Sequence, residues 1–249
     1  SSWGLVAAFD AMKNGRERVR NGMSFLSNDV PGALKSRLAA VNLTSISALA
    51  PFVGSLAIVA VLAYSSGWAF AFTRIYARPV SRGQASMWIY RNVPPPAVMA
   101  NEHWDDPLPL PIPGFDHGKD AGPQLPLYDP DDPKKIDTIV QMLSQSSYIN
   151  ITSNRLYGSI PRMPERYPMT TEYYRRLFAG DLGFSLVATI PSYPSIGPWV
   201  INDDSAEEAF TVYDHPKVLI FRKDGDFSAA RVRQVLTSVS LDNIQNIPP

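Results

Sequence analysis

The sequence predicts a membrane-anchored α/β protein, in which one transmembrane helix, preceded by the end of another, leads into an extracytoplasmic mixed-sheet α/β domain. Three observations support this prediction. No Asp, Glu, Lys or Arg occurs between Leu38 and Thr73. After Arg74, strand-like and helix-like segments alternate over a length sufficient for one core. Basic residues are concentrated in the short segment that precedes the charge-free stretch.

The charge-free stretch supplies a transmembrane helix from Ala48 to Phe72, within a membrane segment that we assign to 48–74. An α-helix rises about 1.5 Å per residue, so about 20 apolar residues cross a hydrocarbon core of about 30 Å. Pro51 is expected in the first turn, where its missing N–H costs little. A buried helix of a large soluble core is the alternative, and the length and lack of charge disfavour it.

Small residues recur along this helix at steps of three and four, which makes one stripe of its surface nearly flat. The residues are Ala50, Gly54, Ala57 and Ala60. Flat stripes allow helices to approach closely. We therefore expect other transmembrane helices as neighbours, as well as the lipid bilayer.

The segment before the helix gives its orientation. Residues 1–9 are apolar and resemble the end of a preceding membrane helix, so we expect the chain to be the C-terminal piece of a longer polypeptide. Residues 10–47 form a loop whose basic residues outnumber its acidic ones. Because short basic loops stay in the cytoplasm, the domain at 75–249 is expected to be extracytoplasmic.

Composition excludes several classes of function. Lys and Arg together number 23, as do Asp and Glu, and the chain has no cysteine. Without a basic block in the domain, a nucleic-acid partner is not expected. Without cysteine, thiol catalysis and cysteine metal sites are excluded.

The pattern after Arg74 predicts the elements of the domain. A long extended loop, pinned by prolines, is expected from Asp105 to Pro133. The last predicted helix starts near Asp226, and Thr170 or Thr171 caps an earlier helix that Gly180 or Gly183 ends. Helices are predicted at 80–93, 131–145, 170–183 and 227–239, and strands at 97–101, 148–152, 184–193, 198–202, 210–214 and 217–223.

Three groups of residues could carry acid–base or metal chemistry, and a structural role is favoured for each. His103 lies among Glu102, Asp105 and Asp106, but this spacing matches no metal signature. The acidic residues Asp203, Asp204, Glu207 and Glu208 are expected at a solvated helix start. His215, beside Asp214, is expected in a turn between two strands. No catalytic residue, metal or cofactor is assigned.

The segment from Ser153 to Tyr174 contains the candidate ligand-binding residues, Arg155, Tyr157, Arg162 and Arg166. Arginine forks and aromatic faces recognise phosphates and sugars. The same residue types also hold long loops onto a domain, and the sequence favours neither role.

Four motifs in this chain resemble the C-terminal end of multi-spanning bacterial glycosyltransferases of family 39, which are dolichyl-phosphate-mannose mannosyltransferase-like with a GT-C fold. The resemblance covers Ile46 to Lys223, and the motifs are TRIYARPVSRGQASMWIYRNVPP, ANEHWDDPLPLPIPG, YINITSNRLYGSIPRMPERYPMTTEYYRRLFAGDLGF and AFTVYDHPKVLIFRK. The resemblance implies a cell inner membrane location and a polyprenyl-phosphate sugar as donor. It also implies catalytic acidic residues in a first extracytoplasmic loop that this chain does not contain.

Two functions are therefore expected as alternatives. The chain is either the C-terminal membrane helix and extracytoplasmic domain of a polyprenyl-phosphate-sugar-dependent glycosyltransferase, or a non-catalytic scaffold subunit of a larger membrane complex. The absent catalytic loop and the flat helix stripe favour the second alternative.

Overall fold

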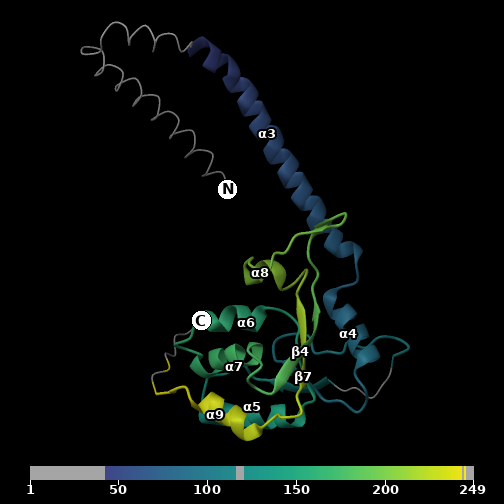
Figure 1. Cartoon of the computed structure of the whole chain (residues 1–249), viewed down its shortest axis with the longest axis vertical. Helices are drawn as coiled ribbons and strands as arrows, with labels where there is room; N and C mark the ends of the chain where they lie inside the picture. The colour runs from purple at the N-terminus through teal and green to yellow at the C-terminus, as the bar shows by residue number, and fades with distance from the viewer. Residues whose placement is uncertain (1–42, 116–120, 243, 245–249) are drawn as a thin grey trace, which may run out of the picture. The chain divides into compact units, whose positions relative to one another are not determined.

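A computed structural model of the protein describes residues 43–115, 121–242 and 244 (Figure 1). The chain divides into two compact units, Ser1–Tyr64 and Ser65–Pro249, and each is considered by itself.

The long apolar helix α3 spans Leu43–Thr73 and contains no charged residue. Among the described residues, one helical stretch, Pro51–Asn92, is long and apolar enough to cross a membrane, and α3 supplies its apolar part. The helix begins at Leu43 rather than Ala48, which places Pro51 inside it and not in its first turn. The predicted preceding helix at 1–9 and residues 10–42 of the predicted loop at 10–47 lie outside the described residues, whereas residues 43–47 of that loop belong to α3.

A five-stranded mixed sheet forms the centre of the domain, as predicted, with strand order β2-β1-β3-β7-β4. Strand β1 pairs in parallel with both β2 and β3, while β7 is antiparallel to β3 and β4. The strands span Met99–Glu102 (β1), Ala121–Leu125 (β2), Tyr148–Ile151 (β3), Phe184–Ile190 (β4) and Val218–Lys223 (β7).

Helices cover both faces of this sheet (Figure 1). One face carries Ile149 and Phe221 and packs in one core with α5, α6, α7 and α9. The other carries Met99 and Ile220 and packs against α4. Neighbouring strand residues therefore alternate between two buried cores, as expected when both faces of a sheet are covered. The helices span Ser81–Asn92 (α4), Pro133–Gln145 (α5), Arg155–Ser159 (α6), Pro168–Phe178 (α7) and Ala229–Thr237 (α9).

Local capping chemistry explains where several helices begin and end. Asp132 caps α5 by accepting a hydrogen bond from the Lys135 backbone N–H, and Pro133 follows at the first helical position. Helix α7 begins at Pro168, so the expected Thr170 or Thr171 cap is wrong. After α7, Gly180 takes a positive φ and forms part of a Schellman end, which confirms the predicted stop.

Two sequence predictions about elements are wrong. The extended loop predicted from Asp105 to Pro133 contains β2, an edge strand of the sheet. The segment from Phe210 to Asp214 is not a strand, because its first residues belong to the short helix α8, Glu208–Thr211. His215 accordingly follows a helix and does not lie in a turn between two strands.

The chain between β4 and α8 forms a small hairpin that projects from the domain. Its strands are β5, Ser195–Ile196, and β6, Trp199–Val200, paired antiparallel and separate from the main sheet. The prediction of a strand at 198–202 is thus confirmed only for two residues. The hairpin contacts the short 3₁₀ helix η1, Arg74–Ala77, which follows α3.

Candidate functional site

The carboxyl ends of β1 and β3 lie side by side, and the chain leaves them in opposite directions. The connection from β1 leads to β2 on one side, whereas the connection from β3 leads through α6 and α7 to β4 at the opposite edge. Open α/β sheets bind ligands outside such a reversal point. A ligand-binding site is therefore expected at the residues directly after these two strands.

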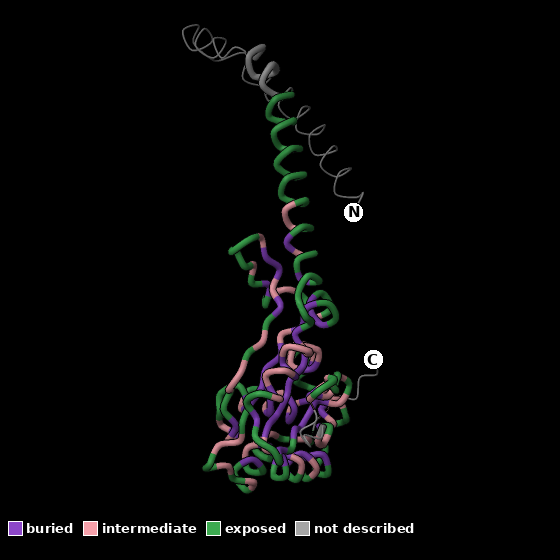
Figure 2. Tube along the Cα trace, turned by 90° about the vertical axis from the view of Figure 1, so that its right-hand side faces the viewer, coloured by how far each residue is buried: buried purple, intermediate pink, exposed green. Residues whose placement is uncertain are grey.

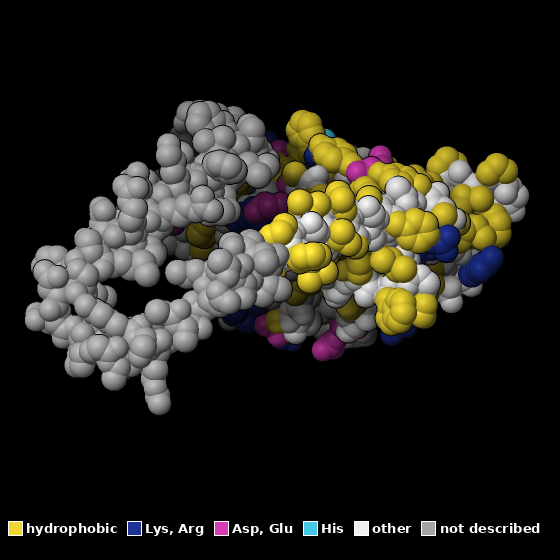
Figure 3. Space-filling view, turned by 90° about the horizontal axis from the view of Figure 1, so that it is seen from above, with side chains coloured by type: hydrophobic (Ala, Val, Ile, Leu, Met, Phe, Trp, Pro, Cys, Tyr) yellow, Lys and Arg dark blue, Asp and Glu magenta, His cyan; other side chains and the backbone are white. Residues whose placement is uncertain are grey.

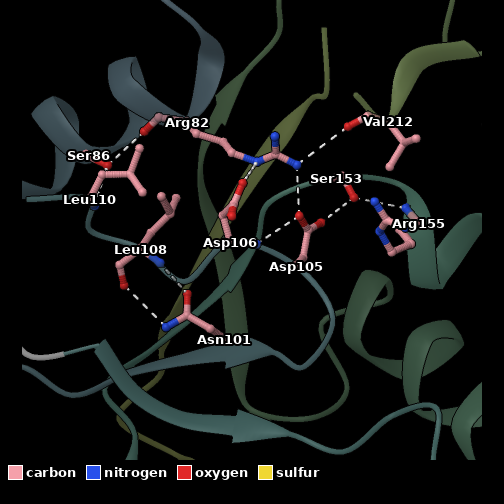
Figure 4. Close-up of polar contacts among 10 residues, drawn as sticks. All are labelled: Arg82, Ser86, Asn101, Asp105, Asp106, Leu108, Leu110, Ser153, Arg155 and Val212. Carbon is pink, nitrogen blue, oxygen red and sulfur yellow. Dashed lines mark hydrogen bonds and ion pairs between the residues drawn. The ribbon is translucent and has the colours of Figure 1, made fainter. Parts of the chain in front are cut away.

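A buried ion pair organises this edge of the sheet (Figure 4). Asp105, after β1, accepts from the Arg82 guanidinium of α4 at 2.8 Å, and both side chains are largely buried. Its other oxygen accepts from the Ser153 hydroxyl, after β3. Because one carboxylate joins α4, β1 and β3, Asp105 is a framework residue and its charge is already compensated.

The proline-rich stretch after Asp106 is held by two further contacts (Figure 4). Asn101 accepts from the Leu108 N–H at 2.9 Å, and the Ser86 hydroxyl accepts from the Leu110 N–H at 2.9 Å. The segment is thus anchored to β1 and α4, which supports the structural role favoured for the His103 group.

Glu102 is an unusual member of this edge because it is a buried carboxyl at the end of β1. It is 2% exposed and accepts from the Tyr174 hydroxyl at 2.6 Å, while its Oε2 has no hydrogen-bond partner among the described residues. The pKa of Glu102 is raised to about 8, mainly because the carboxyl is buried. The hydrogen bond from Tyr174 lowers the pKa, and the nearby charge of Asp105 raises it further. At neutral pH the carboxyl is therefore largely protonated.

A polar pocket of about 260 Å³ lies beside this framework, between α6 and the chain on either side of α8. Asn154 positions the two elements by donating to the Thr211 hydroxyl at 2.7 Å. The lining residues are Asn154, Tyr157, Gly158, Arg162, Tyr193, Asp203, Asp204, Ala206, Glu208, Thr211, His215 and Lys217.

Two acid–base pairs are built into the pocket wall. His215 Nε2 lies 2.8 Å from Asp203 Oδ2, with both side chains buried, and His215 Nδ1 has no hydrogen-bond partner among the described residues. Lys217 Nζ lies 2.8 Å from Asp204 Oδ2. Burial would raise the pKa of Asp204, but hydrogen bonds from Lys217 and Tyr193 outweigh it and lower the pKa, so this carboxylate is ionised at neutral pH.

Two tyrosine hydroxyls also line the pocket, and both stay protonated. Burial, together with the charges of Glu102 and Asp204, raises the pKa of Tyr157 well above its usual value. Burial and a hydrogen bond to Asp204 raise the pKa of Tyr193 to about 12. Because Tyr193 already donates its single hydroxyl proton to Asp204, it presents an acceptor oxygen to the pocket, whereas the Tyr157 hydroxyl is the one placed to donate to a ligand.

The structure brings two of the four predicted ligand-binding residues to this pocket. Tyr157 and Arg162 line it, and Arg162 also pairs with Glu207 at 3.0 Å. Arg155 instead stacks on the Tyr213 ring at 5.2 Å, and Arg166 on the Tyr167 ring at 5.2 Å. These two arginines hold local aromatic contacts and do not line the pocket.

Some of the other lining residues belong to groups that the sequence analysis singled out separately. The sequence shows an acidic group, at Asp203 and Asp204, and a histidine, His215. It does not show that His215 contacts Asp203. Both belong to the irregular chain that flanks α8, whose path no periodic pattern predicts. Within the described residues, no three His, Asp or Glu side chains are placed to hold a metal ion.

The pocket also lies close to the last turn of α3, which belongs to the same compact unit, Ser65–Pro249. The Phe72 ring, in the last turn of α3, packs against the His215 ring at 5.3 Å and the Phe210 ring at 5.4 Å. A side chain of the pocket wall is thus in direct contact with the end of α3.

Comparisons with family models, with curated proteins and with solved structures give no match to this chain.

Proposed function

We propose that this chain is the C-terminal membrane helix and extracytoplasmic domain of a polyprenyl-phosphate-sugar-dependent membrane glycosyltransferase. In this proposal the polar pocket binds a sugar ring of the acceptor or donor. The observation that carries the proposal is the pocket itself, whose wall contacts the end of α3 through His215 and Phe72. If α3 spans the bilayer, the pocket lies next to the membrane, where a lipid-linked sugar would be presented.

The charges in the pocket favour a neutral, hydroxyl-rich ligand over a phosphate. Asp203, Asp204 and Glu208 supply three carboxylates, against Arg162 and Lys217 as fixed cations. A sugar hydroxyl both donates and accepts, so it can bond to carboxylates and to guanidinium or ammonium groups at the same time. A phosphate only accepts, and the carboxylates would repel it. The volume is slightly below the range of about 300–1,000 Å³ typical for drug-sized ligands, which suits a small ring.

Titration with soluble methyl glycosides tests this proposal on the full chain in nanodiscs. Arg162→Met and Glu208→Gln should each weaken glycoside binding by at least about tenfold, since a charge-assisted hydrogen bond contributes about 1.5–3 kcal/mol. Arg175→Met is the matched control, because Arg175 is 59% exposed where Arg162 is 58% exposed, and each pairs with a glutamate.

Two results would contradict the sugar pocket. One is the absence of saturable binding for every glycoside. The other is competition by inorganic phosphate, which would mean that the ligand is an anion.

A second candidate function is a non-catalytic scaffold subunit, which the exposed surface of α3 favours. From Pro51 to Tyr64 every residue of the helix is exposed, including Gly54, Ala57 and Ala60 of the small-residue stripe. Purification from native membranes distinguishes the two. Recovery with unrelated subunits at a fixed ratio supports the scaffold, and recovery as one polypeptide with further helices supports the glycosyltransferase.

A further inference from the structure

The β5–β6 hairpin exposes large apolar side chains at its end, although its base is fixed and partly buried. Trp199 is 73% exposed and Val200 is 60% exposed. They form β6 and directly follow the exposed turn at 197–198, and we call residues 197–200 the hairpin tip. The tube in Figure 2 shows the hairpin rising from the domain as an arm, with a partly buried base and an exposed end. Exposed apolar groups of this kind mark an interaction surface when they are grouped.

Two side-chain hydrogen bonds join the arm to the segment that follows α3. Arg78, directly after η1, donates to the Tyr193 carbonyl at 2.7 Å and to the Ser195 hydroxyl at 3.1 Å. Tyr193 in turn donates to Asp204 at 2.9 Å. The hairpin therefore keeps a fixed place beside the end of the apolar helix.

The neighbouring surface continues the same chemistry. Tyr76, on η1, is 62% exposed, and Phe70 of α3 is also exposed. Arg74, which lies between them in the sequence, is an exposed cation. Among the described side chains visible from above are many hydrophobic ones, with Lys and Arg also present (Figure 3). Tyrosine and tryptophan concentrate at membrane–water interfaces, and basic residues beside them favour anionic lipid headgroups.

We propose that the hairpin tip is a membrane-interface anchor, which inserts Trp199 and Val200 into the headgroup region of the bilayer beside the exit of α3. Continuity with the apolar helix selects lipid as the occupant. The indole suits this depth because its ring is apolar and its N–H can bond to water or headgroups. This inference rests on α3 spanning the membrane and does not depend on the sugar pocket.

The backbone of the hairpin limits how deep it inserts. Two-residue strands leave backbone groups that need water or headgroup partners, so the tip cannot enter the hydrocarbon core. Pro194 and Pro198 remove two N–H donors from the arm, which lowers the cost of partial dehydration. The anchor is therefore shallow.

Site-directed fluorescence in vesicles tests the anchor, because the chain has no native cysteine. Trp199→Cys and, independently, Val200→Cys are labelled with an environment-sensitive fluorophore in the full chain. The chain is reconstituted in vesicles of equal parts phosphatidylcholine and phosphatidylglycerol. Ala230→Cys, at an exposed position on α9, is the control.

Lipids that carry a nitroxide near the headgroup should quench both hairpin labels several-fold more than the label at position 230. Nitroxides deep in the acyl chains should quench the hairpin labels less than the shallow ones do. The proposal is overturned if the hairpin labels are quenched no more than the control. It is also overturned if deep nitroxides quench them more strongly than shallow ones.

Discussion

Glu102 is a buried carboxyl whose pKa is set mainly by burial, and this makes the stability of the domain depend on pH. Its folded-state pKa is raised to about 8, while an unfolded chain titrates near its ordinary value of 4.5. Between these values the folded state holds a proton that the unfolded state has lost. The contribution of Glu102 to the free energy of unfolding therefore falls as the pH rises from about 5 to about 8, by at most about 1.4 kcal/mol per pH unit.

Glu102→Gln should remove this pH dependence, because the amide keeps the shape of the side chain and cannot ionise. We expect the variant to be more stable than the native chain at pH 8. At pH 5 the free energies of unfolding of the two chains should be closer to each other. Urea unfolding of the detergent-solubilised chain at both pH values measures this difference. Glu165→Gln, at an exposed glutamate, is the control and should follow the native chain. An unchanged slope in Glu102→Gln would mean that Glu102 is ionised in the folded protein.

Single residues of the pocket could be identified from the sequence, but their pairings could not. Tyr157 and Arg162 stand close together in a segment rich in arginine and tyrosine, so composition alone points to them. The contact between His215 and Asp203 depends on how the chain turns on both sides of a four-residue helix. No local pattern predicts such a path, since it is set by packing against α6.

At the level of elements, the helices with a clear apolar face and good caps agree with the sequence, as α5 illustrates. The missed strand β2 has the sequence AGPQL, in which glycine and proline both disfavour a strand. Its place at the sheet edge explains why it is tolerated, because an edge strand need not donate every N–H. Gly122 is required there, since a Cβ atom would lie 2.7 Å from the Met99 carbonyl oxygen.

The two glycines after α7 provide a prediction about an element boundary. Gly180 and Gly183 both have positive φ, but a Cβ at Gly183 would lie 2.9 Å from the Phe227 Cα, whereas the space around Gly180 is open. Gly180→Ala should cost about 1–2 kcal/mol from backbone strain alone. Gly183→Ala should cost about 1–3 kcal/mol more, because Phe227 must also move. Urea unfolding of the two variants gives the comparison, and equal losses would contradict the steric argument.

Within the unit Ser65–Pro249, the last turns of α3, the polar pocket and the hairpin tip are joined by direct contacts. The ring of Phe72 contacts the pocket wall, and Arg78 ties the hairpin to η1. Under the proposals for the pocket and the hairpin, these contacts would hold a sugar site at a fixed height above a bilayer that α3 spans. A lipid-linked sugar needs such a fixed height, because its lipid keeps it at the membrane surface.

The predicted orientation can be tested on the whole chain by cysteine accessibility, again because no native cysteine competes for the label. Basic residues in the loop at 10–47 predict that this loop is cytoplasmic and that the domain at 75–249 is extracytoplasmic. In bacterial spheroplasts, a membrane-impermeant maleimide should therefore modify Ala230→Cys before lysis, and should modify Ser36→Cys only after lysis. The opposite result would place the pocket and the hairpin on the cytoplasmic side. There they could not meet an extracytoplasmic sugar acceptor, and the glycosyltransferase proposal would fail while the interface anchor would stand.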